Sequence, residues 1–423
     1  MISKGTFYTI LNGIAQLIKA ITSLVVNKVI VVLLGSTALL FVGNLKSVFT
    51  ILQQISGAGV YEGAVKYLSG EYKNRKTFIL QACLSLMLFG FLISIALYFI
   101  LFDQTLDLLQ LGENDSDLIP WLIGGIVLSL LCFVFHTLMQ SFFHGLKSYK
   151  IIVQSTLISA LLTLGVSTAL IYYVNKIGLI LSVFVPSVIL LLTYSFHIRK
   201  SWYFGRVLFY KPFRLFIFKP LLSFTSMSAV AAIVFPSVLI TIRILLVEHS
   251  GVELASYWEG YSRLSLFISG LAISSISLYY LPKLVEANTG EEMLKVVLWG
   301  VKFLFVVAFP AMLLILLFGS NVILLLYTTN FLELTFLLKW ELLGTFLKLL
   351  SFTVSFIMVA KKLTRVFVLS ELISGLVFFG LSVLLVEVYG VVGASMAYAG
   401  TYLMYLLWVV IYFGKRFRFF ERG

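Results

Sequence analysis

The stretch LIPWLIGGIVLSLLCFVFHTLMQSFFHGL, residues 118–146, contains no lysine, arginine, aspartate or glutamate. A helix needs about 20 mostly apolar residues to cross the hydrocarbon core of a bilayer, so this stretch is long enough to span a membrane. An acidic segment, residues 113–117, precedes it, and Lys147 and Lys150 follow it. The stretch therefore predicts a transmembrane helix whose two ends differ in charge.

Most of the chain has the same character. Of its 423 residues 61% are hydrophobic and only 12% are charged, which is about half the charged share of a soluble domain. This composition excludes a soluble enzyme, a disordered chain and a disulfide-rich scaffold, and the two cysteines, Cys83 and Cys132, lie in apolar runs. Stretches long enough to span a membrane lie at about 5–34, 37–69, 77–102, 118–146, 150–174, 177–199, 216–248, 253–283, 291–318, 331–360, 363–388 and 391–414.

We therefore expect an all-α, polytopic membrane protein with twelve transmembrane helices in two six-helix lobes. The longest connection between spans is rich in aromatic and basic residues, which is typical either of a segment lying on an anionic membrane surface or of a plain basic linker. It divides the chain into an N-terminal lobe, 1–199, a linker, 200–215, and a C-terminal lobe, 216–423. Gly35, Gly251 and Gly390 fall in tight connections, where glycine relieves backbone strain.

The basic residues of the connections predict the orientation of the chain in the membrane. With the N-terminus in the cytoplasm, Lys176 is the only lysine or arginine in a connection on the outer side. Both termini are then cytoplasmic. Because the net charge of +13 is largely explained by this asymmetry, we do not expect a nucleic acid partner.

Charged residues inside the predicted spans carry the functional signal, since such a residue costs about 2.5–3.5 kcal/mol when it faces lipid. It must snorkel to the interface, pair with an opposite charge or face a water-filled cavity. The cations outnumber the acids, which predicts a cavity that attracts an anion, and lysines together with arginines suit a diphosphate. The cations are Lys19, Lys28, Lys46, Lys66, Arg243, Arg263, Lys302, Lys339 and Lys348, and the acids are Glu62, Glu259, Glu341 and Glu371.

Some of these charges have an expected partner. The spacing of Glu62 and Lys66, and of Glu259 and Arg263, predicts two ion pairs within helices. Glu341 has no such partner and is a candidate for ion coupling.

Uncharged residues add to the predicted cavity. Asn44 offers a hydrogen-bonding amide, and the ring of Trp258 can stack on a sugar. The alternative for this ring and its aromatic neighbours is ordinary packing.

The sequence contains no catalytic pattern. The four histidines have no metal-ligand spacing and no P-loop is found. We expect no enzymatic activity, no cofactor and no metal, so the energy for any transport must come from an ion gradient or from the substrate gradient.

The chain resembles the Wzx-type flippases of the multidrug/oligosaccharidyl-lipid/polysaccharide exporter superfamily from end to end. The segments that carry the resemblance are NKVIVVLLG with Lys28, VGNLKSVFTIL with Asn44, ISGAGVYEGAVKY with Lys66, TIRILL with Arg243, YWEGYS with Trp258, LYYLPKL, and KWELLGTFLKLL with Lys348.

The resemblance implies two six-helix lobes that form a V around a central cavity. It implies that undecaprenyl-diphosphate-linked oligosaccharide, a lipid III or O-antigen unit, is moved by alternating access from the cytoplasmic to the periplasmic leaflet of the bacterial inner membrane. Lys28, Lys66, Arg243 and Lys348 match family positions and are candidates for binding the diphosphate and glycan, whereas Glu341 departs from the family pattern. The expected partners are this lipid-linked glycan, membrane lipids, a glycan polymerase and a chain-length regulator.

The sequence leaves three alternative functions open. A cation-coupled multidrug exporter of the same superfamily is the main alternative, but its substrates are usually cationic, which a lysine-rich cavity disfavours. A membrane-embedded polymerase or ligase needs a long periplasmic loop, and the outer connections are short. A scaffold for a glycan assembly complex is compatible with transport.

Overall fold

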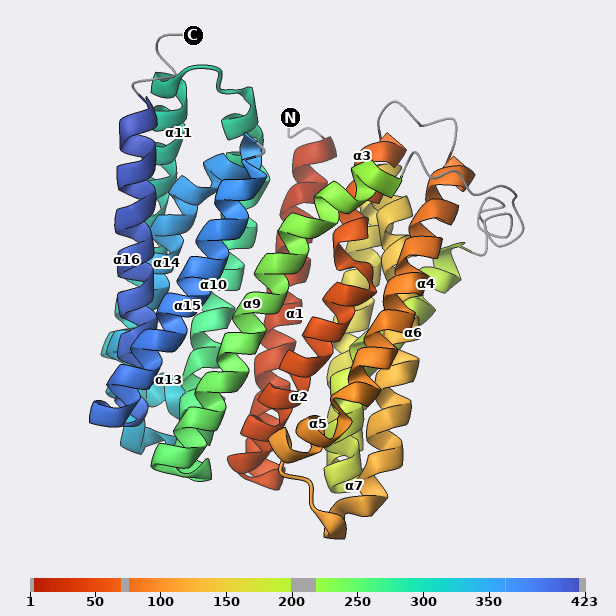
Figure 1. Ribbon diagram of the computed structural model, residues 1–423, viewed down its shortest axis with the longest axis vertical. Coiled ribbons are helices and arrows are strands. Elements are labelled where there is room, and N and C mark those ends of the chain that lie inside the picture. Colours follow the sequence, from red (N-terminus) through yellow and green to blue (C-terminus); the bar gives the residue numbers. More distant parts are fainter. Residues whose placement is uncertain (1–3, 70–75, 199–217, 362, 418–423) are drawn as a thin grey trace. The chain divides into compact units, whose positions relative to one another are not determined.

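The computed structural model describes residues 4–69, 76–198, 218–361 and 363–417 (Figure 1). The regular elements in these ranges are helices, with no strand among them. Ten of the described helices are long and apolar enough to cross a membrane, so the predicted all-α membrane class is confirmed. The described chain divides into two compact units, which are residues 1–34 with 41–237 and residues 35–40 with 238–423.

The first unit is built around a hydrophobic core where α3, α4, α6 and α7 meet. Leu80, Cys83, Leu138 and Phe142 are buried there together with Tyr194. Figure 1 shows α4 and α6 side by side, and α1 packs against α7. The helices of this unit are α1 (Lys4–Leu34), α2 (Thr37–Gln53), α3 (Gly59–Ser69), α4 (Lys76–Ile100), α5 (Phe102–Leu108), α6 (Ile119–Gly145) and α7 (Tyr149–Ile198).

The long helix α7 consists of two arms. Its backbone leaves the helical region at Asn175, with φ 49° and ψ −119°. Beyond this kink the chain approaches itself so closely that a Cβ at Gly178 would lie 1.9 Å from the carbonyl oxygen of Leu170. The kink falls between the two predicted spans 150–174 and 177–199, as the sequence pattern indicates.

The predicted span 37–69 is broken, which the sequence pattern does not predict. A π-helical turn, η1 (Gln54–Ala58), separates α2 from α3, and Gly57 has φ 113°. The hydroxyls of Ser56 and Ser94 both donate to the carbonyl oxygen of Leu52, each at 2.9 Å. An irregular backbone inside a membrane needs such internal partners, and α4 supplies one of them.

The second unit packs α14 against α10 and α16, and α15 against α16. Its helices are α10 (Val252–Glu286), α11 (Gly290–Phe303), α12 (Phe309–Leu317), α13 (Gly319–Leu326), α14 (Leu337–Ala360), α15 (Thr364–Tyr389) and α16 (Val391–Phe417), preceded by α9 (Phe218–Ser250). A second π-helical turn, η5 (Leu304–Ala308), joins α11 to α12. The three glycines expected in tight connections, Gly35, Gly251 and Gly390, have φ 88°, 86° and 57°, which confirms that expectation.

The limits of the predicted lobes remain predictions, because the linker 200–215 lies within 199–217, outside the described residues. The first part of α9, up to Ser237, groups with the first unit, whereas the prediction assigns it to the C-terminal lobe. The count of twelve spans and the V-shaped arrangement also stay predictions.

Candidate functional site

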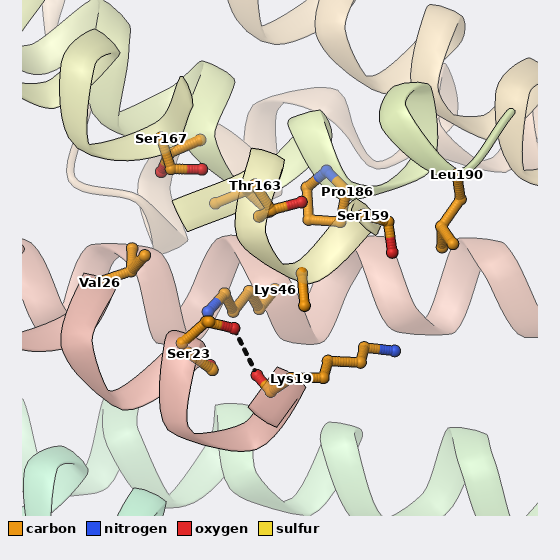
Figure 2. A pocket seen from close by; sticks show the side chains of 13 residues that line it. Lys19, Ser23, Val26, Lys46, Ser159, Thr163, Ser167, Pro186 and Leu190 are labelled. Carbon is orange, nitrogen blue, oxygen red and sulfur yellow. Dashed lines mark hydrogen bonds between the residues drawn. The ribbon is translucent and has the colours of Figure 1, made fainter. Parts of the chain in front are cut away.

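A polar cavity of about 150 Å³ lies within the first unit, between α1, α2 and the two arms of α7 (Figure 2). In this view the two lysines lie with α1 and α2, and the hydroxyl side chains of α7 lie across from them. The lining residues are Lys19, Thr22, Ser23, Val26, Lys46, Ser159, Ala160, Thr163, Ser167, Ser182, Val183, Pro186 and Leu190.

The lining of this cavity is positively charged. It contains the ammonium groups of Lys19 and Lys46, and none of the thirteen lining residues is acidic. Six further lining residues carry hydroxyl groups. Cations and hydroxyl donors around a space inside the membrane region are the groups that stabilise an anion.

The hydroxyls of the cavity differ in what they already bind. Thr22 donates to the carbonyl of Lys19 at 2.7 Å, and Ser159 and Ser182 also donate to carbonyls of their own helix. The hydroxyl of Ser167 is buried and has no hydrogen-bond partner among the described residues. Leaving a buried donor unsatisfied is unfavourable, so Ser167 is a group that a ligand in the cavity would satisfy.

The second unit holds a buried charge cluster of Arg243, Glu259 and Arg263. The two Nε atoms lie 2.7 Å from the two carboxylate oxygens of Glu259. Arg263 also donates through Nη2 to the carbonyl oxygen of Leu39 at 2.8 Å. One carboxylate between two guanidinium groups leaves the cluster with one net positive charge.

These contacts test two expectations from the sequence. The predicted ion pair of Glu259 and Arg263 is confirmed. Arg243, which we expected to face a cavity, is instead held by Glu259, because α9 brings it against the other oxygen of that carboxylate. Its role in substrate binding stays a prediction.

A second polar group of this unit surrounds Glu341 on α14. Its carboxylate is buried and accepts hydrogen bonds from the hydroxyls of Ser265 at 2.6 Å and Ser395 at 2.7 Å. Lys348, two turns further along the same helix, is also buried, and its Nζ lies 5.3 Å from the centre of the Tyr402 ring. Cation–π contact of this kind stabilises an ammonium group in a desolvated place.

The remaining predicted site residues are spread over both units. Lys28 is half-buried on α1. The amide of Asn44 donates to the carbonyl of Leu108 at 3.1 Å and so connects α2 to α5. Trp258 is only 1% exposed, so its ring contacts protein in this structure and its predicted stacking on a sugar remains untested. The side chains of Lys66 and its predicted partner Glu62 lie outside the described part of the chain.

The hydroxyl side chains of α7 that line the cavity are not among the residues predicted from the sequence, although their spacing in the sequence indicates that they share a face. Ser159, Thr163 and Ser167 recur at every fourth position, which places them on one face of a helix. The sequence indicates that Lys19 and Lys46 are costly in a membrane, but it does not place them in one site, because no pattern predicts that α1, α2 and α7 adjoin.

The fold is similar to that of solved membrane transporters. An inward-facing MATE family multidrug resistance transporter matches with a TM-score of 0.79 at 13% identity, over 96% of each chain. The lipid II flippase MurJ, in an inward closed conformation, matches with a TM-score of 0.73 at 16% identity, over 95% of this chain and 87% of that one.

The sequence relatives are more specific. The chain is 24% identical over 421 residues to the lipid III flippase of Escherichia coli (strain K12), which covers 96% of each protein, and equally similar to the lipid III flippase of Shigella flexneri. No known family model matches the sequence. These relatives confirm the resemblance to lipid-linked oligosaccharide flippases.

Proposed function

We propose that this protein is a flippase that moves a lipid-linked oligosaccharide with a diphosphate headgroup across the bacterial inner membrane. The observation that carries the proposal is the similarity to lipid III flippases over 96% of the chain. The cationic cavity of the first unit supports it, because its lining chemistry suits a phosphorylated headgroup.

In this function the polar head occupies a cationic space among the helices while the polyprenyl tail stays in lipid. The cations lower the energy of the diphosphate away from bulk water, and alternating access presents it to each side in turn. We assign substrate binding to Lys19 and Lys46 in addition to the residues predicted from the sequence, and ion coupling to Glu341. The residues predicted from the sequence are Lys28, Asn44, Lys66, Arg243, Trp258 and Lys348.

The proposal also covers the location, orientation, substrate and partners of the protein. It acts as a transporter rather than as an enzyme, in the inner membrane with both termini in the cytoplasm. Its substrate is a lipid III or O-antigen unit, and a glycan polymerase and a chain-length regulator are its proposed partners.

A multidrug exporter is the alternative, since MATE transporters share the fold. Cationic drugs would be repelled by a cavity that contains two lysines and whose lining includes no acidic residue. This observation favours the anionic substrate.

Reconstitution in vesicles tests the function. The full chain is incorporated into liposomes with a fluorescent polyprenyl-diphosphate oligosaccharide, and the fraction protected from a membrane-impermeant quencher is followed over time. We expect the protein to accelerate transbilayer exchange and the double variant Lys19→Gln/Lys46→Gln to lose most of this acceleration. Lys176→Gln is the matched control, because that side chain is 71% exposed and belongs to the same unit. Exchange no faster than in empty vesicles would refute the proposal.

A further inference from the structure

We propose that Glu371 on α15 is a second proton-binding carboxylate of this protein, and that protons pass between Glu371 and Glu341 under the control of Lys348, a cation that the two acids share. The claim that this transfer drives transport rests on the proposed function. The assignment of the three side chains rests on the second unit alone, to which all of them belong.

Glu371 is an acid inside a helix that is long and apolar enough to span a membrane. It is the eighth residue of α15, which places it about 10.5 Å from the start of the helix at 1.5 Å per residue. Its side chain is half-buried, and the ammonium group of Lys348 acts on its carboxylate. Acids at such a depth are costly in a membrane and commonly belong to proton pathways.

A series of contacts across α14, α16 and α15 connects Lys348 to this acid. The Nζ atom of Lys348 lies 5.3 Å from the centre of the Tyr402 ring, and the rings of Tyr402 and Tyr405 are 6.5 Å apart. The hydroxyl of Tyr405 lies 3.3 Å from the hydroxyl of Ser370, the residue that precedes Glu371. The ammonium group and the carboxylate are close enough to interact electrostatically.

Glu341 is the other carboxylate that acts on Lys348. The two residues are seven positions apart on α14, which is nearly two turns and about 10.5 Å along the axis, so they share a face. Glu341 is 2% exposed, and its carboxylate accepts from the hydroxyls of Ser265 and Ser395. One ammonium group thus serves two acids. Because a carboxylate without a full counter-charge is costly away from water, the acid that does not hold Lys348 carries a proton.

The neighbouring titratable groups do not take over this role. Within the described residues, those that face the two acids are Tyr398, Tyr402 and Tyr405 of α16 and Glu259 of α10. Glu259 is held by two arginines, and a phenol stays neutral at neutral pH. Glu341 and Glu371 are therefore the groups of this cluster that exchange a proton.

The chemistry of the cluster favours a proton over a metal ion. Among the described residues, no three acidic, histidine or cysteine side chains come together in a way that could hold a metal. The hydroxyls of Ser265 and Ser395 lie 2.6 Å and 2.7 Å from the two carboxylate oxygens of Glu341. A proton adds to one of these oxygens without moving its neighbours, whereas a sodium ion would have to separate them.

The two acids lie towards opposite ends of the second unit. Glu341 is the fifth residue of α14, and α15 follows α14 after a short connection. Consecutive helices joined in this way run antiparallel, so the first turns of α14 and α15 face opposite sides of the membrane. A proton taken up by one carboxylate leaves Lys348 to the other, which then releases its own proton on its own side. Each step forms one O–H bond and breaks one.

Infrared spectroscopy of the purified full chain in detergent tests the shared proton. At neutral pH we expect the C=O stretching band of one protonated carboxyl group. Glu371→Gln should lose this band, because the remaining acid then has Lys348 to itself, and Glu371→Asp should keep it, which separates loss of the proton site from damage to the fold. Glu387→Gln is the matched control, since that residue is exposed on the same helix, and should also keep the band. An unchanged band in Glu371→Gln would overturn the proposal.

Replacing the cation gives the opposite result. In Lys348→Met neither acid has its counter-charge, so both should carry a proton at neutral pH and the band should grow about twofold. Lys339→Met is the matched control, because Lys339 is exposed on the same helix, and it should leave the band as it is. A band of equal size in Lys348→Met and the original protein would show that Lys348 does not control the two acids.

The vesicle assay connects the proton to transport. We expect the flipping rate in Glu371→Gln to lose its response to an imposed pH gradient, and the double variant Glu371→Gln/Glu341→Gln to behave like either single variant, since both acids act in one path. A response to a sodium gradient in place of a pH gradient would refute the relay. Because the infrared band is read without transport, a protein with the expected bands that does not flip lipid would refute the proposed function and leave the proton site in place.

Discussion

Replacing Glu259 by glutamine tests directly how much the buried charge cluster of the second unit contributes to the stability of the protein. The carboxylate accepts from the Nε atoms of Arg243 and Arg263, both at 2.7 Å, and all three side chains are at least nine-tenths buried. An amide of the same shape removes the negative charge and can accept through only one oxygen. The substitution raises the net charge of the cluster from one to two without changing its volume.

The expected loss is large. Breaking a buried ion pair by removing one partner costs about 3–5 kcal/mol, because the remaining charge stays desolvated. Since each 1.4 kcal/mol is a factor of about ten in an equilibrium constant, the ratio of folded to unfolded protein should fall by two orders of magnitude or more. Arg243→Gln should cost less, because Glu259 keeps its pair with Arg263.

The measurement is thermal unfolding in detergent, followed by circular dichroism and by tryptophan fluorescence, to which the buried ring of Trp258 next to Glu259 contributes. The double variant Glu259→Gln/Arg243→Gln restores a net charge of one and should recover part of the lost stability. If Glu259→Gln unfolds like the original protein, the buried cluster does not contribute to stability and the reasoning fails. If the double variant is less stable than Glu259→Gln, net charge is not the cause.

Three further predictions concern packing, coupling and substrate binding. Gly90→Ala places a Cβ 2.4 Å from the carbonyl oxygen of Ile55 and should lower the unfolding temperature, whereas Gly165→Ala, where nothing lies within 4 Å, should not; equal effects would contradict the close packing of α4 on the π-turn. Glu341→Gln keeps a hydrogen-bond acceptor but removes the charge, so flipping in vesicles should become independent of an imposed pH gradient; unchanged pH dependence would remove Glu341 from coupling. Lys348→Met keeps the apolar stem against the aromatic rings and should lower the flipping rate without loss of folded protein.

The sequence predicts features that depend on neighbours along the chain. Span lengths, the kink near Asn175, the three connecting glycines and the pair of Glu259 and Arg263 all follow from local spacing. They can be predicted because the length of an apolar stretch and the helical spacing of its residues are properties of one segment.

Features that need contacts between distant segments were not predicted. Arg243 lies 16 residues before Glu259 on another helix, so no helical spacing links them. The break at Gly57 depends on the hydroxyl of Ser94, which α4 contributes to the carbonyl of Leu52. The cavity likewise depends on the packing of α1, α2 and α7, which no pattern in the sequence predicts.

The cations of the two units have different surroundings, and this difference separates the predicted site residues. In the second unit Arg243 and Arg263 share a carboxylate, so the Nε atom of Arg243 is already occupied by Glu259. In the first unit Lys19 and Lys46 face hydroxyls across a lining without acids. The residues that line that cavity therefore contribute positive charge and hydroxyl groups but no carboxylate.

Helical geometry also separates Lys28 from this cavity. Nine residues along α1 correspond to two and a half turns at 3.6 residues per turn, and about 13.5 Å at 1.5 Å per residue. Lys19 and Lys28 therefore project from opposite faces of the helix, and one phosphoryl group of a substrate in the cavity cannot contact both. If both lysines bind substrate, as proposed, Lys28 must contact a part of it outside this cavity, so Lys19→Gln and Lys28→Gln should slow flipping independently and their effects should multiply in the double variant. A double variant that is no slower than either single variant would show that the two lysines act on one group of the substrate and that the helical assignment of faces is wrong.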